Sequence, residues 1–383
     1  MSKLSIYLPP YAPDYSGAAS ALFELGGLVV IHDASGCTGN YTGFDEPRWA
    51  NGSSMVFCSA LRHMDAILGN DDKFIGKIIK AAESLKPKFI AILGSPVPMI
   101  IGTDFKGIAK EIEQLTGIPT IGIQTTGLKY YSRGIYDITI ELLKKFVPKS
   151  MNKEKGSVNL LGITPLDFYT NNHKDFIEFF EKQNIKVNCT YYMGTDLDKM
   201  VRSSHSILNI AVSQCGVEVA KYMEKVYDIP YIVSTPLGTG SVTLNYVTSF
   251  LKDGKIETYI PIIDNAKTLI IGEQIIGNSI REYMQKELKY SGIKVATLYD
   301  ISEEFFFDGD IKIKNERHLI DIVNSGEYTK IIGDPMIQKL IKKKEINFYE
   351  LPHVALSSKL YWKDSKQFIS VEMEEWLKKI AIE

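Results

Sequence analysis

Hydrophobic residues along the chain form short continuous runs that alternate with segments of helical period. Residues 86–127 contain an apolar run, a turn of Gly, Ser and Pro, an amphipathic stretch of period 3.6 and the apolar run GIPTIGI. The same order recurs over 205–238 and, in shortened form, over 328–353. Continuous apolar strands with helices between them are typical of parallel sheets covered on both faces. The pattern therefore predicts repeated βαβ units.

Two further segments, 157–192 and 266–300, also read as strand, polar turn, helix and strand. The alternation is interrupted by the charged segment KFVPKSMNKEKGS at 145–157 and by YIPIIDNAK at 259–267. We expect domain boundaries at these two interruptions. The last segment, 370–383, is amphipathic, and we expect it to pack back onto the body of the protein as a clasp helix.

The fold class predicted from this alternation is α/β, with three doubly wound domains of mainly parallel sheets around a central cleft. Ligand sites in such sheets lie at the carboxyl ends of the strands, so three of them can face one shared cleft. The predicted domains are 1–150, 151–262, and 263–383 with the clasp helix.

Composition and charge narrow the function classes. With 44 basic and 46 acidic side chains, the net charge of -2 gives no field that favours nucleic acid or an anionic membrane as a partner. The first residues resemble neither a signal nor a transit peptide, and no apolar run approaches the roughly 18 residues of a membrane helix. We therefore expect a cytoplasmic protein. In that compartment cysteines stay reduced and serve as metal ligands, reactive groups or core residues, here Cys37, Cys58, Cys189 and Cys215.

Cys37 lies in the segment HDASGCTGN, directly after the apolar run GGLVVI. Gly36 and Gly39 flank it and let backbone amides approach a sulfur atom, an environment that iron–sulfur clusters use. The spacing leaves two interpretations open, a cluster ligand and a loop cysteine without a role. Cys58 follows 21 residues later and no CxxC pair is present, so these two cysteines do not define a site by themselves.

Several blocks resemble signatures of one family. HDASGC, with His32 and Cys37, resembles the H-G-x-x-G-C signature of nitrogenase component 1 proteins, which include molybdenum-iron protein subunits, cofactor scaffolds and tetrapyrrole reductases. VPMIIGTDFKGIAKEI resembles their E-x-I-G-D-D-I block, and AKYMEKVYDIPYIVSTPLGTGSVT resembles A-x-x-M-E-x-x-Y-G-I-P followed by P-x-G-x-x-x-T. The resemblance extends over nearly the whole chain, and the order of the blocks makes it more specific than any one motif.

The segment CSALRHMDAILGNDDKFIGKI resembles a further block of the family. Asp65, Gly69 and Lys73 fit its pattern of acidic residues, D-h-h-F-G-G and a Lys-rich helix start. The sequence departs from that pattern at two positions, where Leu68 replaces Phe and Asn70 replaces the second Gly.

By this resemblance, Cys37 and Cys58 correspond to the first two cysteines that hold an Fe-S cluster between paired subunits, with Gly36 in the binding loop. The third family cysteine is absent, because Ser95 and Pro96 occupy its place. A 4Fe-4S cluster takes four ligands, and a two-fold homodimer supplies two thiols twice. We therefore expect one 4Fe-4S cluster shared across a homodimer. A diverged sister subunit is the alternative partner, and the Ser95 hydroxyl is a candidate supplementary ligand.

Two residues are candidates for the inter-domain cleft. Cys215 lies three residues after Val212, where the resemblance places the cysteine that anchors the family's active-site cofactor. Cys215 either faces the same cleft or is a small buried residue at a helix start. His353, in YELPHVALSSKLYW, lies near the loop that the family's third domain delivers towards this cofactor, and it is a candidate general acid. The segment EEFFFDGD at 303–310 is either a hydrophobic plug between domains or a substrate box.

The resemblance implies an oxygen-sensitive reductase subunit that works under anaerobic conditions. Electrons would arrive from a separate ATP-hydrolysing Fe protein through the cluster and would pass to the cleft, to reduce a small molecule or tetrapyrrole or to reach a second metallocluster. PLGTGSVT lacks the lysine of a P-loop, so we do not expect this chain to hydrolyse ATP. The alternatives are a non-enzymatic scaffold or carrier for metallocluster assembly, and a binding module without redox chemistry.

Overall fold

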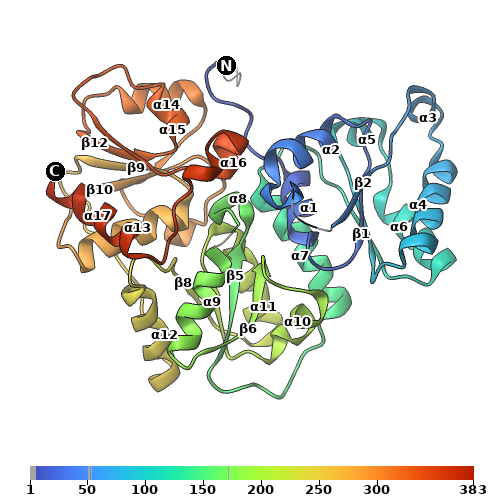
Figure 1. Ribbon diagram of the computed structural model, residues 1–383, viewed down its shortest axis with the longest axis horizontal. Coiled ribbons are helices and arrows are strands. Elements are labelled where there is room, and N and C mark those ends of the chain that lie inside the picture. Colours follow the sequence, from blue (N-terminus) through green and yellow to red (C-terminus); the bar gives the residue numbers. More distant parts are fainter. Residues whose placement is uncertain (1–5, 51, 53, 171) are drawn as a thin grey trace.

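The computed structural model describes residues 6–50, 52, 54–170 and 172–383. These residues form three units, each built on one sheet (Figure 1). Every pair of neighbouring strands in the three sheets is parallel. The predicted α/β class with parallel sheets is therefore confirmed. In the described part of the chain, no helix has the length and apolar character that a membrane crossing requires.

The first unit contains a four-stranded sheet of order β2-β1-β3-β4. Side chains of the continuous apolar strands alternate between two cores, because Leu28 and Val30 pack with α4 and α6 while Val29 and Ile31 pack with α1 and α7. Its strands are β1 (Leu28–Ile31), β2 (Met55–Cys58), β3 (Ile90–Leu93) and β4 (Thr120–Ile123). Its helices are α1 (Asp14–Leu22), α2 (Gly36–Asn40), η1 (Tyr41–Asp45), η2 (Pro47–Ala50), α3 (His63–Leu68), α4 (Asp71–Leu85), α5 (Pro96–Ile101), α6 (Phe105–Thr116) and α7 (Tyr131–Phe146).

The second unit contains a four-stranded sheet of order β6-β5-β7-β8. Every residue of β5 and β7 is buried, as their continuous apolar character requires. The strands are β5 (Ser157–Ile163), β6 (Lys186–Tyr192), β7 (Leu208–Ala211) and β8 (Tyr231–Val233). The helices are α8 (Pro165–Phe168), α9 (Asn172–Lys182), α10 (Leu197–Arg202), η3 (Ser203–His205), α11 (Gln214–Tyr227) and α12 (Ser241–Asp253). Cys189 is buried in β6, among core residues.

The third unit contains a five-stranded sheet of order β11-β10-β9-β12-β13. Its strands are β9 (Thr268–Gly272), β10 (Ile293–Thr297), β11 (Ile311–Lys312), β12 (Lys330–Gly333) and β13 (Asn347–Glu350). Its helices are α13 (Gln274–Lys286), η4 (Glu303–Phe305), α14 (Glu316–Val323), α15 (Pro335–Gln338), α16 (Val354–Ser357), η5 (Ser358–Asp364) and α17 (Val371–Ile382). Met373, Leu377 and Ile380 of the last helix are buried in the same core as residues of the second sheet.

The three units meet through helices that follow the strands. Helix α8 of the second unit adjoins α16 of the third, and α11 of the second adjoins α7 of the first. Figure 1 shows α8 and α16 near the centre of the molecule, where the three groups of elements converge. The positions of the domain boundaries, 145–157 and 259–267, stay predictions.

Candidate functional site

Three neighbouring strands of the first sheet bring the predicted cluster residues to one edge. Ile31 of β1 is in register with Cys58 of β2 and with Leu93 of β3, so the three strands end together. Cys58 is the last residue of β2, Cys37 lies in the first turn of α2 after β1, and Ser95 precedes α5 after β3. We call the site formed by Cys37, Cys58 and Ser95 the cysteine edge.

Both thiols of the cysteine edge are half-buried. The backbone N–H of Ala60 donates to Cys58 Sγ at 3.2 Å, and this thiol donates to the carbonyl oxygen of Asp33 at 3.3 Å. Burial and the Asp33 carboxylate raise the pKa of the Cys37 thiol. Metal binding at Cys37 would therefore have to displace a proton.

The backbone around Cys37 leaves room for a ligand or a partner chain. A Cβ atom added at Gly36 or at Gly39 would meet no atom within 4 Å. Ser95 is fully buried and its hydroxyl donates to the carbonyl oxygen of His32 at 2.8 Å. Two accessible thiols with a backbone donor directed at one of them fit half of a 4Fe-4S site, which takes four ligands. Among the described residues of one chain, no group of three or more His, Cys, Asp and Glu side chains is arranged to hold a metal ion.

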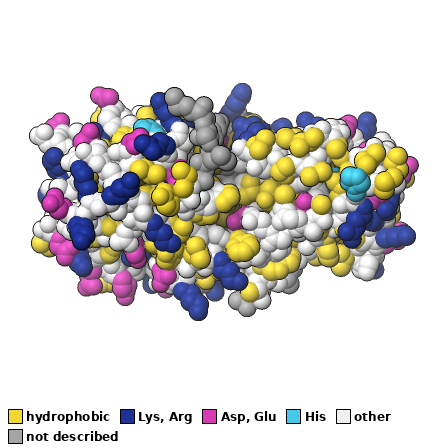
Figure 2. All heavy atoms as spheres, turned by 90° about the horizontal axis from the view of Figure 1, so that it is seen from above, with side chains coloured by type: hydrophobic (Ala, Val, Ile, Leu, Met, Phe, Trp, Pro, Cys, Tyr) yellow, Lys and Arg dark blue, Asp and Glu magenta, His cyan; other side chains and the backbone are white. Residues whose placement is uncertain are grey.

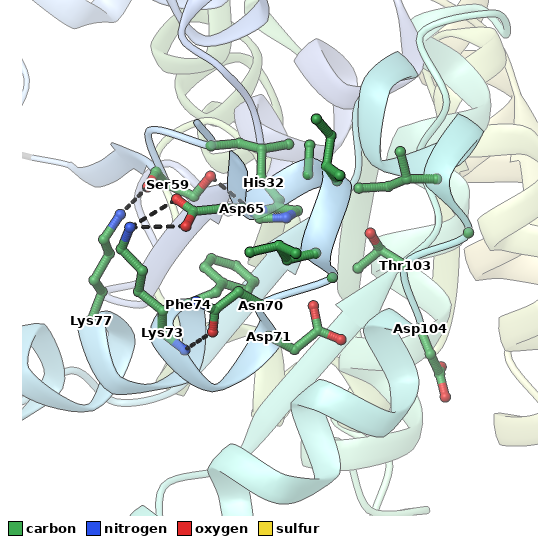
Figure 3. A pocket seen from close by; sticks show the side chains of 17 residues that line it. His32, Ser59, Asp65, Asn70, Asp71, Lys73, Phe74, Lys77, Thr103 and Asp104 are labelled. Atoms are coloured by element: carbon green, nitrogen blue, oxygen red, sulfur yellow. Dashed lines mark hydrogen bonds and ion pairs between the residues drawn. The ribbon is translucent and has the colours of Figure 1, made fainter. Parts of the chain in front are cut away.

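A polar cavity of about 380 Å³ lies beside the cysteine edge, between α3, α4 and α5 (Figure 3). The His32 ring stacks on Phe74 with 4.0 Å between ring centroids, and its Nδ1 lies 2.9 Å from Ser59 Oγ. Burial lowers the pKa of His32 to about 4, so the ring is neutral at pH 7.

The wall formed by α4 is charged, and Figure 3 shows Lys73 and Lys77 extending from it to Asp65 and Ser59. Lys73 Nζ contacts both carboxylate oxygens of Asp65 at 2.9 Å, while Lys77 Nζ donates to the Ser59 carbonyl oxygen at 3.0 Å. Asn70 caps α4 by accepting from the backbone N–H of Lys73. The departure from the family pattern at this position thus places a helix-capping residue at the start of α4.

A second polar cluster joins the three units. Tyr131 donates to Asp167 Oδ1 at 2.5 Å, and His353 Nε2 lies 3.0 Å from the same oxygen. Tyr299 Oη lies 2.8 Å from His353 Nδ1. Tyr131 begins α7 of the first unit, Asp167 lies in α8 of the second, and Tyr299 and His353 belong to the third. We call this cluster the central junction, and it consists of Tyr131, Asp167, Cys215, Glu273, Tyr299 and His353.

The central junction shifts the acidity of its members. Burial and the Asp167 charge raise the pKa of the Cys215 thiol well above its ordinary value. Glu273 caps α13, accepting from the backbone N–H groups of Ile275 at 3.0 Å and Ile276 at 2.8 Å. Burial and then the Asp167 charge raise the pKa of Glu273 to about 7. A carboxyl group of this kind is able to hold a proton near neutral pH.

The predicted central cleft is closed at this place. The cavity beside Asp167, Glu273 and His353 measures about 20 Å³, and the side chains of Cys215 and Tyr299 are buried. A water molecule occupies a cavity of about 10–15 Å³ or more, so this space suits a water. A tetrapyrrole or a second metallocluster does not fit, because side chains from all three units fill the junction. Cys215 and His353 therefore both lie at the central junction, but neither faces a space large enough for a ligand.

Sequence reasoning did not identify four members of the central junction. Asp167 and Glu273 follow the buried strands β5 and β9, and acidic residues at the carboxyl ends of parallel strands were a usable signal. Tyr131 and Tyr299 had no such local signal, because only the packing of the first unit against the third brings them together.

Three parallel-sheet units around a polar junction, with two thiols at one edge of the first sheet, define a three-unit α/β protein. The family model of nitrogenase component 1 type oxidoreductases matches residues 13–244. The chain belongs to this family.

Curated relatives are similar over different shares of the chain. The nitrogenase iron-molybdenum cofactor biosynthesis protein NifE of Methanococcus maripaludis is 25% identical over 361 residues, which covers 86% of this chain and 70% of the relative. A subunit of the light-independent protochlorophyllide reductase of Cyanophora paradoxa is 24% identical over 238 residues, which covers 59% of this chain. The chain spans about half the length of that reductase subunit, 52%.

A solved structure described as "Nitrogenase Cp1 at pH 6.5" has the same fold. The superposition covers 99% of this chain and 93% of the other, with a TM-score of 0.73 and 13% sequence identity. The likeness confirms the nitrogenase component 1-like architecture.

Proposed function

We propose that this chain is an electron-transferring subunit of a nitrogenase-like reductase, and that it pairs with a second copy around one 4Fe-4S cluster. The observation that supports the proposal is that Cys37 and Cys58 follow or end neighbouring strands at the same edge of the first sheet, where both are half-buried. When bound there, the cluster would supply one-electron chemistry. The thiols of both copies would hold it, and the Ala60 N–H would stabilise the sulfur of Cys58.

The surface around the cysteine edge supports a partner chain. Figure 2, which views the molecule from above, shows hydrophobic side chains gathered over the half that contains the first unit. Exposed apolar side chains in such number favour a protein–protein contact. A two-fold contact places each side chain against the same surface of its partner, so one patch suffices for both copies. The exposed apolar residues on elements that form or adjoin the edge include Phe44, Phe57, Val97, Ile100, Ile101, Leu128 and Leu360.

The electron source proposed is a separate ATP-hydrolysing Fe protein, since the chain contains no P-loop lysine in PLGTGSVT. The protochlorophyllide reductase relative is itself named as a subunit, which agrees with a reaction shared among chains. The substrate proposed is an unsaturated small molecule or a tetrapyrrole. Because the central junction is packed, we place this substrate outside it, within electron-transfer reach of the cysteine edge.

A scaffold or carrier for metallocluster assembly is the second candidate function. Two observations favour it, the packed central junction and a relative named as a cofactor biosynthesis protein over 86% of this chain. A scaffold needs an accessible cluster site but no substrate cavity. A reductase needs a cluster site and also a substrate cavity.

The first experiment measures iron and electron paramagnetic resonance spectra on protein purified without oxygen. We expect about four iron atoms per dimer, as one 4Fe-4S cluster requires. Cys37→Ala should remove the iron and the visible absorbance, whereas the control Cys189→Ala should retain both because Cys189 is buried in β6. Colourless wild-type protein would show a binding module without redox chemistry and would end the proposal.

The second experiment separates the two candidate functions. The iron-loaded protein is incubated with an Fe protein, a reductant and ATP. Substrate turnover, with protochlorophyllide as the tetrapyrrole probe, supports the reductase. Transfer of iron and sulfide to an apo-acceptor protein without turnover supports the scaffold.

A further inference from the structure

A third cavity lies between the second and third units, away from both sites described above. Its volume is about 360 Å³, within the range of about 300–1,000 Å³ that small-molecule pockets occupy. The end of α11, strand β8, helices α12 and α13, and the segments 256–259 and 304–307 form its walls. It shares α13 with the cavity of the central junction, but the two have no lining residue in common.

The walls of this cavity are aromatic. The ring of Tyr259 meets the ring of Phe307 edge to face, with 6.3 Å between centroids. Lys286 Nζ lies 4.5 Å from the ring centroid of Tyr246 and 5.7 Å from that of Tyr259, so an ammonium group of the protein already uses these rings. The aromatic lining residues are Tyr231, Tyr246, Tyr259, Phe305 and Phe307.

The charged side chains that line this cavity are all acidic. Four of the lining residues are glutamates, and none of the residues that line the cavity is Lys, Arg or His. Glu282 pairs with Lys286 at 2.9 Å and Glu304 pairs with Lys221 at 2.8 Å, so these two charges are partly neutralised. In the described part of the chain, Glu224 and Glu257 are exposed and form no ion pair within 4.0 Å. The cavity therefore carries an uncompensated negative charge at its accessible side.

We propose that this cavity binds a small organic cation with a flat apolar body. The aromatic rings would cover the body of the ligand, while ring faces and glutamates would attract its positive charge. Anionic ligands, including the carboxylates of a tetrapyrrole, would meet repulsion from the same glutamates. Phe305 and Phe307 line this cavity, which favours the substrate box over the hydrophobic plug for the segment 303–310.

The test uses three indole probes that share one ring system and differ in charge. Tryptamine carries an ammonium group, indole is neutral, and indole-3-propionate carries a carboxylate. By isothermal titration calorimetry on the full chain, we expect tryptamine to bind about tenfold more tightly than indole-3-propionate, a difference of about 1.4 kcal/mol, with indole between them. Equal affinities, a preference for indole-3-propionate, or no binding of tryptamine would overturn the proposal.

Substitutions locate the binding. Glu257→Gln should reduce the preference for tryptamine, and Glu257→Lys should reverse it in favour of indole-3-propionate. Phe305→Ala should weaken all three probes by a similar factor, because it removes an apolar wall and no charge. Glu345→Gln, a change at an exposed glutamate outside the cavity, is the control and should leave the preference unchanged. A preference that survives Glu257→Lys would place the binding elsewhere and contradict the proposal. None of these readouts depends on iron, so the result is independent of the proposed cluster.

Discussion

The cysteine edge and the central junction both form where parallel strands end, yet they differ in what satisfies their polar groups. At the cysteine edge the two thiols are half-buried, and glycines beside Cys37 leave open space around the backbone. At the central junction, Cys215 is 2% exposed and Asp167 is 4% exposed, and the two partners of Asp167 Oδ1 come from the chain itself. The first region is open to other molecules, whereas the second is closed, and in it the buried Asp167 Oδ2 has no hydrogen-bond partner among the described residues.

This difference indicates that the central junction contributes to stability and that the cysteine edge contributes to binding. A buried hydrogen-bonded network that spans three units fixes their relative positions, because every partner removed leaves another polar group unsatisfied. A half-exposed pair of thiols contributes little to folding and remains available for a metal and a partner chain. Substitutions should therefore affect stability at the central junction and cluster binding at the cysteine edge.

The largest expected contrast is between Asp167→Ala and Cys58→Ala in iron-free protein. Asp167→Ala leaves the Tyr131 hydroxyl and the His353 ring without their shared acceptor, and we expect it to lower the free energy of unfolding by about 3–5 kcal/mol. Cys58→Ala should cost less than about 1 kcal/mol, because the side chain is half-buried. Urea denaturation followed by circular dichroism measures both. Similar losses of unfolding free energy in the two variants would contradict these different roles of the two regions.

Glu273 gives the central junction a pH dependence of its own. Burial and Asp167 raise the pKa of Glu273 from 4.5 to about 7, so the folded chain holds a proton that the unfolded chain releases in this range. Its contribution to stability therefore falls as the pH rises from about 4.5 through about 7, by up to about 2–3 kcal/mol. Glu273→Gln removes this fall. The stability of the variant minus that of wild type should increase by that amount between pH 5 and pH 8.

The comparison at two pH values cancels the loss of hydrogen bonds in this variant. Glutamine has one acceptor oxygen, whereas the two oxygens of Glu273 accept from three backbone N–H groups, of Gln214, Ile275 and Ile276. That cost is the same at both pH values, so only the titration changes the difference. A difference that stays constant between pH 5 and pH 8 would show that Glu273 is ionised throughout.

The alternation of apolar runs was sufficient to predict the class of fold. Runs such as IAIL at 90–93 are buried on both faces, and a parallel strand covered by helices is the arrangement that accounts for this. The placement of Cys37 and Cys58 at one edge was also accessible to prediction, because both lie at the carboxyl ends of neighbouring parallel strands. Their role as cluster ligands stays a prediction.

The packed state of the central junction was not accessible in this way. Tyr131 and Tyr299 are 168 positions apart, and they meet only after the first and third units have docked, with 5.4 Å between their ring centroids. Whether a cleft is open or filled depends on the sizes of side chains from three units at one point. The local sequence pattern carries no information on how these side chains fill the space together. The sequence therefore predicted a cleft where the structure has about 20 Å³ of free space.

His32, beside the cysteine edge, should give a pH dependence of opposite sign. Burial lowers the pKa of His32 from 6.5 to about 4, so on acidification the unfolded chain takes up a proton that the folded chain does not. Its contribution to stability falls as the pH decreases from about 6.5 towards 4, by about 1–2 kcal/mol after allowance for the solvent in the adjoining cavity. In iron-free protein, the free energy of unfolding of His32→Gln minus that of wild type should therefore be larger at pH 4.5 than at pH 7. The same sign of slope as for Glu273→Gln would refute the assignment.

The smallest expected effect concerns the surface of the cysteine edge. Ile100 of α5 is 77% exposed next to the edge, and Ile260 of the linker between the second and third units is 80% exposed. Serine at either position should change the free energy of unfolding by less than about 0.5 kcal/mol, because neither side chain is in a core. Sedimentation should nevertheless show that Ile100→Ser weakens dimerisation about tenfold, or about 1.4 kcal/mol, while Ile260→Ser does not. An isoleucine buried against a partner loses that contact, whereas one that faces water in the dimer loses nothing. If both variants dimerise as wild type does, the apolar surface of the first unit is not the contact, and two copies would not bring their thiols together.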